Sequence, residues 1–136
     1  MNDCIFCKII IGEIPSHKVY EDNDVLAFLD IKPLNPGHTL VVPKRHAESM
    51  LDSAEEDMRS IMSVIKKIAP AILRATGASA CNVSNNNGAA AGQVVFHTHF
   101  HVIPRHDGDG YAPWHRTERP DSDAAQVAEK IRQELG

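Results

Sequence analysis

Long apolar runs are scarce in this sequence of 136 residues. Stretches such as Ile9–Ile11 are only a few residues long, whereas a transmembrane helix needs about 20 apolar residues. They are also too short for the apolar core of a secretory signal. An excess of positive charge is missing as well, because 14 Lys and Arg face 18 Asp and Glu and leave a net charge of −4. We therefore expect a cytoplasmic protein with neither a membrane nor a nucleic acid as its partner.

Cysteine is also rare, with three residues in the chain. A cytoplasmic compartment disfavours disulfides, so metal binding or inert burial are the expected uses. Cys4 and Cys7 form a C-x₂-C pair, which supplies two of the four ligands that a structural zinc site needs. A thioredoxin-like redox pair is the alternative, but that motif follows a βαβ context, which residues 1–3 cannot provide. Cys81 lies in an expected strand, and we expect it in the core.

The apolar pattern predicts one α+β domain over residues 1–136, with an antiparallel sheet and one long helix. Expected strands cover residues 18–21, 25–30, 38–42, 80–84 and 94–103, and one or two helical turns fall within 3–12. Ser53 and Glu56 form a capping box that starts the long helix, and Gly77 ends it. Pro70 lies inside this helix and predicts a kink or a locally broken hydrogen bond.

Residues 104–136 are expected to form a C-terminal tail segment and a helix. The part from 104 to 120 contains Gly, Asp and Pro and predicts irregular structure. Asp121 or Ser122 could cap a final helix, in which Val127, Ile131 and Leu135 recur at a spacing of four.

Three of the eight histidines fall within five residues, at His97, His99 and His101. Side chains alternate between the faces of a strand, so all three rings should point to the same side. Positions i and i+4 are roughly 13 Å apart in a strand, so one shared metal ion would strain the geometry. A plain polar face would mix in Lys, Glu, Thr and Ser. An adjacent pair of rings can still converge on one ion, so the pattern favours proton transfer, nucleophilic attack or metal binding.

The segment from Asn85 to Gln93 leads directly into the histidines and consists of Asn, Gly, Ala and one Gln. Asparagine and glycine tolerate unusual backbone conformations, and small side chains leave N–H groups uncovered. Such a loop can be a plain flexible turn or can wrap an anion. Beside three histidines, we interpret it as a phosphate-binding loop.

Together these residues resemble the histidine triad (HIT) family, whose signature His-φ-His-φ-His-φ-φ (φ, apolar) matches residues 97–103 except at Thr98. The resemblance extends from Cys4 to about Trp114 and includes residues 28–31, 36–46 and 92–93. Within the family the chain is similar to the Hint-like branch in its zinc-containing bacterial form. That form implies a structural Zn²⁺ held by Cys4, Cys7, His46 and His97. It also implies a homodimer in which two five-stranded sheets join edge to edge.

The resemblance implies a nucleotidyl hydrolase that acts at the α-phosphate of purine nucleoside phosphoramidates or related conjugates. By position, His99 would be the nucleophile that forms a nucleotidyl-histidine intermediate, and the backbone carbonyl of His97 would orient it. His101 would bind a phosphate oxygen and assist proton transfer, and Gln93 would stabilise charge near the leaving group.

An AMP-type nucleotide is the implied ligand. Asp30 would bind the ribose, although it could equally cap the turn before Pro33. The implied purine pocket could also be simple core packing at Phe28 and Ile31. The full set of implied nucleotide-binding positions is Phe6, Phe28, Asp30, Ile31, Asn86, Gly92, Gln93, Val94, His99 and His101.

Two departures limit the transfer of specificity. Better-known Hint relatives carry serine after the Gly-Gln pair, where this chain has Val94. Their Trp-Pro tail is replaced by residues 111–114, Tyr-Ala-Pro-Trp. Residues 103–105 also resemble the dinucleoside-polyphosphate branch. Hydrolysis of dinucleoside polyphosphates, or nucleotide binding in a regulatory or interaction protein, therefore stay open as alternatives.

Overall fold

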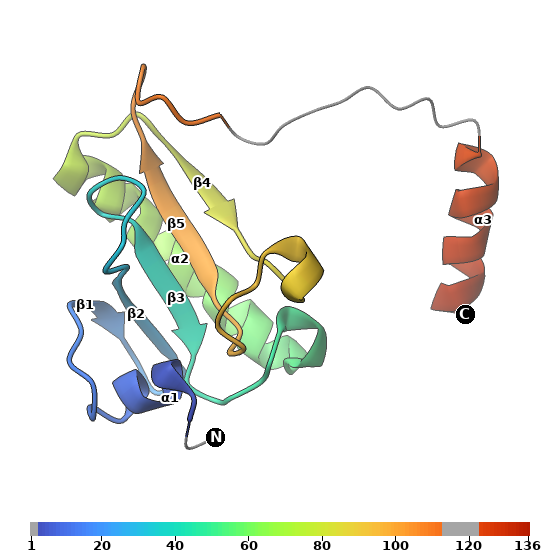
Figure 1. Cartoon of the computed structure of the whole chain (residues 1–136), viewed down its shortest axis with the longest axis horizontal. Helices are drawn as coiled ribbons and strands as arrows, with labels where there is room; N and C mark the ends of the chain where they lie inside the picture. Colours follow the sequence, from blue (N-terminus) through green and yellow to red (C-terminus); the bar gives the residue numbers. More distant parts are fainter. Residues whose placement is uncertain (1–2, 113–122) are drawn as a thin grey trace.

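The computed structural model describes residues 3–112 and 123–136. Its strands form one antiparallel sheet in the order β1-β2-β3-β5-β4 (Figure 1). They are β1 (Lys18–Glu21), β2 (Val25–Leu29), β3 (Thr39–Pro43), β4 (Ala80–Ser84) and β5 (Phe100–Arg105). The helices are α1 (Ile5–Ile10), α2 (Glu55–Thr76) and α3 (Ala124–Leu135), with short 3-10 turns η1 (Met50–Asp52) and η2 (Ala89–Ala91). The predicted α+β class, with five antiparallel strands and one long helix, is confirmed.

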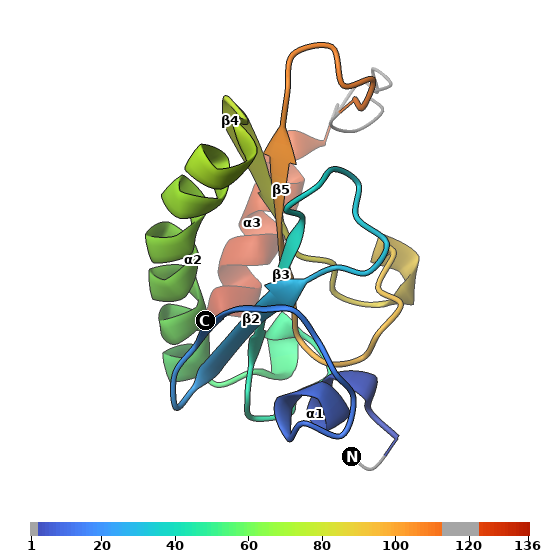
Figure 2. The ribbon, with the colours of Figure 1, turned by 90° about the vertical axis from the view of Figure 1, so that its left-hand side faces the viewer.

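The two faces of the sheet are covered by different helices, as Figure 2 shows, with α2 on one side and α1 on the other. Alternation along the strands explains this arrangement. Val25, Ala27, Phe100 and Val102 pack with the apolar side of α2. Leu26, Phe28, Leu40 and Val42 point to the other face and pack with Phe6 and Ile9 of α1. Because Phe100 and Val102 face α2, the alternation turns His101 toward the α1 face.

The start of α2 differs from the predicted capping box. Ala54 is the N-cap and offers no side-chain hydrogen bond. The hydroxyl of Ser53 instead donates to the carbonyl of Ser49 at 2.8 Å and lies 2.7 Å from the hydroxyl of Thr98. Ser53 is therefore used to join two loops, and three acidic residues in the first turn of α2 complement the helix dipole there.

The expected kink at Pro70 does not interrupt α2, which continues without a break to Thr76. Proline has no N–H to donate to the carbonyl four residues before it. Both Pro70 and Lys66 are exposed, so water can satisfy that carbonyl. Gly77 adopts a left-handed conformation and ends the helix, as predicted.

The last strand begins later than the predicted range of 94–103. β5 pairs with β3 only from Phe100 onward, opposite Val41. This pairing ends at Val41 and does not extend to Pro43, which has no N–H and whose carbonyl oxygen lies 2.8 Å from Nε2 of His97. The N–H of Thr98 donates to the carbonyl of Ala47 instead of a sheet neighbour. His97 and His99 therefore precede the strand, and only His101 belongs to it.

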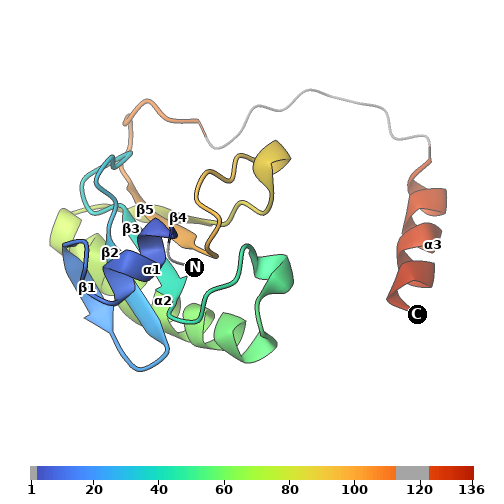
Figure 3. The same ribbon diagram turned by 60° about the horizontal axis from the view of Figure 1, so that its bottom comes forward.

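The helix α3 is set apart from the sheet (Figures 1 and 3), and none of its residues is buried. The residue range of α3 agrees with the predicted terminal helix. Asp121, Ser122 and Trp114 lie outside the described residues. Among the described residues, no helix is both long and apolar enough to cross a membrane.

Candidate nucleotide and metal site

The two N-terminal cysteines and two distant histidines come together in one cluster. Cys4 is the N-cap of α1 and Cys7 lies in its first turn, so the helix directs both sulfur atoms to the same point. His46 follows β3 and His97 precedes β5. One ligand atom from each of these four residues lies within 4.8 Å of the other three.

The separations in this cluster fit a tetrahedral metal ion. Zinc–ligand lengths of about 2.05 Å for nitrogen and 2.3 Å for sulfur place two nitrogens about 3.4 Å apart and nitrogen and sulfur about 3.6 Å apart. Nδ1 of His46 and Nδ1 of His97 are separated by 3.1 Å. The sulfur of Cys4 is 3.4 Å from Nδ1 of His97, and that of Cys7 is 3.4 Å from Nδ1 of His46.

The position of the hydrogen on the His97 ring also suits metal binding. Its Nε2 lies 2.8 Å from the carbonyl oxygen of Pro43, which can only accept, so Nε2 carries the hydrogen and Nδ1 keeps its lone pair. A metal-binding histidine characteristically donates its other N–H in this way. Burial, with a further contribution from Cys4, raises the pKa of the Cys7 thiol to about 11. A cation would therefore be needed to hold the Cys7 sulfur as a thiolate.

His99 has a fixed tautomer. Its Nδ1 lies 2.7 Å from the carbonyl oxygen of His97, so Nδ1 donates and the lone pair is on Nε2. The ring is buried and packs edge-on against Phe6, with the centroids 5.1 Å apart. The carbonyl of His99 accepts a hydrogen bond from the Asn85 side chain at 2.8 Å. These contacts hold the His99 imidazole in one orientation.

His101 lies beside His99, with ring centroids 5.2 Å apart. Its Nδ1 is 2.9 Å from Nε2 of a buried neighbour, His38, which precedes β3. Burial is the main cause that lowers the pKa of His101 to about 4, and the nearby rings of His99 and His38 lower it further. His101 is therefore neutral at pH 7. The three histidines of the motif are partly or fully buried, so a solvent-facing polar face is ruled out.

Two of the predicted nucleoside-binding residues, Phe6 and Asp30, lie beside these histidine rings. Phe6 packs against Phe28 with centroids 5.6 Å apart, and both side chains are buried. Asp30 has one carboxylate oxygen 3.6 Å from Nε2 of His38, while its other oxygen accepts from the N–H of Lys32 at 2.9 Å. Asp30 therefore stabilises its own turn and still lies near the histidines. The neighbouring Ile31 is 86% exposed, which excludes core packing for its side chain.

The side chain of Gln93 stabilises the loop before the histidines. The Gln93 side chain accepts from the N–H of Gly88 at 2.7 Å and donates to the carbonyls of Glu48 and Val95. These bonds occupy the amide and give Gln93 a structural task that its predicted role near the leaving group does not include. Gly92 adopts a φ of +91°, and a β-carbon there would lie 3.7 Å from the Asn86 side chain.

Thr98, the departure from the apolar signature, is almost fully buried. Its hydroxyl lies 2.7 Å from that of Ser53 and 3.3 Å from the carbonyl of Ala47, so its polar atom has partners. His38 was not among the predicted site residues. Its signal was a histidine at the start of a strand, but the sheet register that puts Leu40 opposite His101 is invisible in the sequence.

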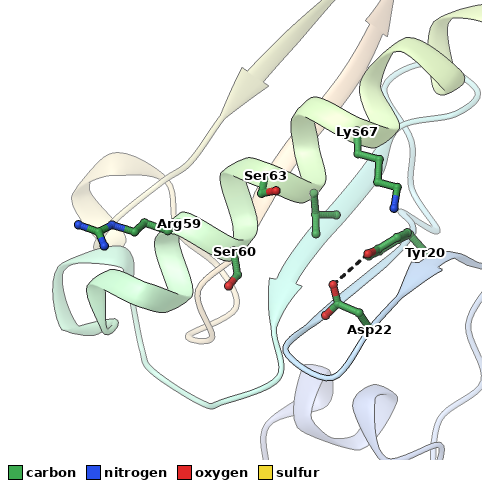
Figure 4. A pocket seen from close by; sticks show the side chains of 7 residues that line it. Tyr20, Asp22, Arg59, Ser60, Ser63 and Lys67 are labelled. Atoms are coloured by element: carbon green, nitrogen blue, oxygen red, sulfur yellow. Dashed lines mark hydrogen bonds between the residues drawn. The ribbon is translucent and has the colours of Figure 1, made fainter.

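Another hollow lies on the α2 side of the molecule, away from the histidines (Figure 4). It lies between β1 and α2. Tyr20 donates to Asp22 at 3.0 Å, and the ammonium of Lys67 lies 5.1 Å from the centre of the Tyr20 ring. Three of its lining side chains, Tyr20, Asp22 and Lys67, thus contact one another, and we assign the hollow no role in the histidine site.

Comparison with known proteins identifies the family of this chain. The HIT domain model matches residues 11–108. An uncharacterised HIT-like protein of Borreliella burgdorferi is 55% identical over 113 residues, 82% of this chain and 81% of its own length. The adenylylsulfatase HINT3 of Arabidopsis thaliana is 48% identical over 108 residues, 79% of this chain and 55% of that protein.

Solved structures agree in fold. SMU.412c of Streptococcus mutans has a TM-score of 0.94 and 47% identity, covering 100% of this chain and 87% of that one. A zinc-bound histidine triad protein of Mycobacterium smegmatis has a TM-score of 0.78 and 36% identity, covering 97% of this chain and 98% of that one. The matched model and these relatives show that the chain belongs to the HIT family.

Proposed function

We propose that this protein is a nucleotidyl hydrolase. Its substrates would be purine nucleoside 5′-phosphoramidates or related conjugates in which a leaving group is joined to the α-phosphate. The observation that carries the proposal is the hydrogen bond from Nδ1 of His99 to the carbonyl of His97. That bond places the hydrogen of the buried ring on Nδ1, so that Nε2 can attack phosphorus through its lone pair.

The reaction would proceed in two displacements. Nε2 of His99 forms a bond to phosphorus while the bond from phosphorus to the leaving amine breaks. The amine departs with the electron pair and takes a proton from water. The nucleotidyl-imidazolium is stabilised by the His97 carbonyl, which continues to accept from Nδ1. Water then attacks phosphorus while the bond from phosphorus to Nε2 breaks, and the proton that this water loses returns to the solvent. The products are a nucleoside monophosphate and free His99.

The surrounding residues would bind the nucleotide. Phe6 and Phe28 lie on the α1 face of the sheet beside His99 and offer apolar contacts for a purine. Asp30 can accept hydrogen bonds from the two ribose hydroxyls. The remaining proposed contacts are Ile31, Asn86, Gly92, Gln93 and Val94, with the N–H of Val94 directed to the phosphate.

We also propose that Cys4, Cys7, His46 and His97 hold a structural zinc ion, on the basis of their donor types and separations. When bound, the ion would fasten α1 to the start of β5 and fix the backbone of His97. That backbone in turn orients His99. Zinc would thus act on structure rather than on the substrate.

A homodimer is the proposed assembly. β4 forms one edge of the sheet, and four of its five residues are exposed. An exposed edge strand is usually covered or paired, and a second β4 could continue the sheet across a two-fold axis. A mass in solution close to that of one chain would contradict this assembly.

The central test is His99→Asn, measured with adenosine 5′-phosphoramidate. Turnover should fall at least about a thousandfold, because the nucleophile is removed. Binding of AMP and the thermal midpoint should change little. His17→Asn is the matched control, since His17 is exposed and precedes β1. Full activity in the His99→Asn protein would overturn the mechanism.

A substrate panel separates the leaving groups. We would compare the phosphoramidate with adenosine 5′-phosphosulfate, because the relative in Arabidopsis is an adenylylsulfatase, and with diadenosine tri- and tetraphosphates. Rapid phosphoramidate hydrolysis with slow polyphosphate hydrolysis supports the proposal. If AMP binds while no member of the panel is hydrolysed, the protein is a nucleotide-binding module instead.

A further inference from the structure

His38 is a buried histidine that belongs neither to the cysteine cluster nor to the nucleophile. Only 6% of its surface is exposed. The turn before β3 holds its backbone at both ends, because its N–H donates to Asn35 at 3.0 Å and its carbonyl accepts from Asp30 at 2.9 Å. Gly37 permits this close turn, since a β-carbon there would lie 2.6 Å from the Thr76 side chain. The ring is therefore fixed against His101.

The contacts of His38 assign its proton. The N–H of Leu34 donates to Nδ1 of His38 at 3.0 Å. A backbone N–H can only donate, so Nδ1 holds a lone pair and the single hydrogen of the neutral ring is on Nε2. That Nε2 lies 2.9 Å from Nδ1 of His101. His38 therefore donates, Nδ1 of His101 accepts, and the hydrogen of the His101 ring is on its own Nε2.

We propose that His38 is a positioning residue that holds His101 as its Nε2–H tautomer, so that a hydrogen-bond donor lies beside the lone pair of His99. The tautomer itself follows from the hydrogen bonds, while its catalytic meaning rests on the proposed function. Both rings are neutral at pH 7, because burial lowers the pKa of His38 and of His101. In each of these two neutral rings, one nitrogen carries the hydrogen and donates, and the other carries the lone pair and accepts.

The assignment makes the site complementary to a phosphate group. A nucleophile needs a lone pair directed at phosphorus, whereas a neighbouring phosphate oxygen needs a donor. His99 supplies the first and His101 the second. In the other tautomer of His101, the nitrogen on the substrate side would present a lone pair to an anionic oxygen and repel it. Asp30 does not compete for the His38 hydrogen, since its oxygen at 3.6 Å is too distant for a hydrogen bond.

A divalent metal ion is the competing occupant. Ligand atoms of Asp30, His38 and His101 lie within 4.8 Å of one another, and two histidines with one carboxylate can bind a transition metal. A metal on Nε2 of His38, however, would require the hydrogen on Nδ1, where it would oppose the N–H of Leu34. A hydrogen bond between the two rings satisfies all of these atoms.

The test is ¹⁵N NMR of the histidine rings in the full-length protein at pH 7, with one equivalent of zinc. The wild-type His101 should show a protonated Nε2 and an unprotonated Nδ1. In His38→Phe the donor is lost, and the His101 signals should shift toward a mixture of tautomers. In His38→Gln the side-chain amide can donate from nearly the same position, and the wild-type pattern should return.

Kinetics supply a second, independent readout. For His38→Phe, kcat on the phosphoramidate should fall about ten- to a hundredfold, as for the loss of one hydrogen bond to a charged group. KM should change little, and His38→Gln should recover most of kcat. His17→Phe is the matched control for replacing a histidine by phenylalanine, because His17 is exposed.

Three results would overturn the proposal. One is a wild-type His101 that is protonated on Nδ1. Another is a His38→Phe protein with unchanged His101 signals. The third is loss of the His38 and His101 N–H signals on addition of a second equivalent of zinc, which would show a metal site. The NMR measurement decides the tautomer even if no nucleotidyl substrate is hydrolysed, so it can fail or succeed independently of the proposed function.

Discussion

Zinc binding predicts how protein stability depends on the concentration of free zinc, and the slope of that dependence gives the number of ions bound. If one ion binds the folded protein at Cys4, Cys7, His46 and His97, free zinc stabilises the fold by mass action. Once free zinc exceeds its dissociation constant, each tenfold increase should raise the free energy of unfolding by about 1.4 kcal/mol. For a domain of this size, 1 kcal/mol corresponds to roughly 3–5 °C in the thermal midpoint. The midpoint should therefore rise by about 4–7 °C for each tenfold increase.

The assay is thermal or denaturant unfolding in a series of zinc–chelator buffers. In the double variant Cys4→Ser/Cys7→Ser, two of the four ligands lose their thiolates, and the midpoint should no longer depend on zinc. Cys81→Ala is the matched control. Cys81 packs against the core on the α2 side of the sheet, so its loss can lower stability but should leave the zinc dependence unchanged.

The slope also tests whether a second ion binds. Occupation of Asp30, His38 and His101 as well would double the dependence to about 2.8 kcal/mol for each tenfold increase. A wild-type midpoint that ignores free zinc would refute the four-ligand site. An equal slope in the double cysteine variant would show that zinc binds elsewhere.

Three further predictions concern stability. Phe6→Ala should lower the free energy of unfolding by about 3–5 kcal/mol, since it leaves a cavity beside Phe28 and His99 that urea unfolding would detect. Because burial depresses the pKa of His101 to about 4, the unfolded chain binds protons first, so stability should fall as the pH drops from about 6.5 toward 4. His101→Asn should flatten this part of the stability–pH curve, and an unchanged curve would argue against the assignment. The Arg105 guanidinium holds the pKa of Asp109 well below its usual range, so this pair should stabilise the fold above about pH 4 and lose its effect in stronger acid. Asp109→Asn should remove that dependence in acid unfolding, and a variant that retains it would contradict the pairing.

Local sequence was sufficient for most of the secondary structure. Runs of consecutive apolar residues predicted β2 and β3 to within about one residue, because burial on both faces of the sheet requires apolar side chains at consecutive positions. The apolar spacing within α2 and the glycine at its end, Gly77, likewise predicted the helix, because both are local features of the sequence. The cysteine pair and its spacing were readable for the same reason, since one helical turn brings both sulfurs together.

Long-range contacts decided the rest. The capping box failed because the hydroxyl of Ser53 binds Ser49 and lies against Thr98, which is 45 residues away. The predicted strand was too long at its start because Pro43, far earlier in the chain, ends the ladder and its carbonyl contacts His97. A sequence pattern shows which atoms could form hydrogen bonds, but it does not show which partner the fold brings within bonding distance.

The histidine motif shows the same division. Its spacing of two was enough to predict three chemically important rings in one place. Only the tertiary structure separated them: Nδ1 of His97 faces the cysteines, Nδ1 of His99 faces a carbonyl, and Nδ1 of His101 faces His38. The tautomer of a neutral imidazole is set by the partner of each nitrogen, and those partners come from α1, from the preceding backbone and from the turn before β3.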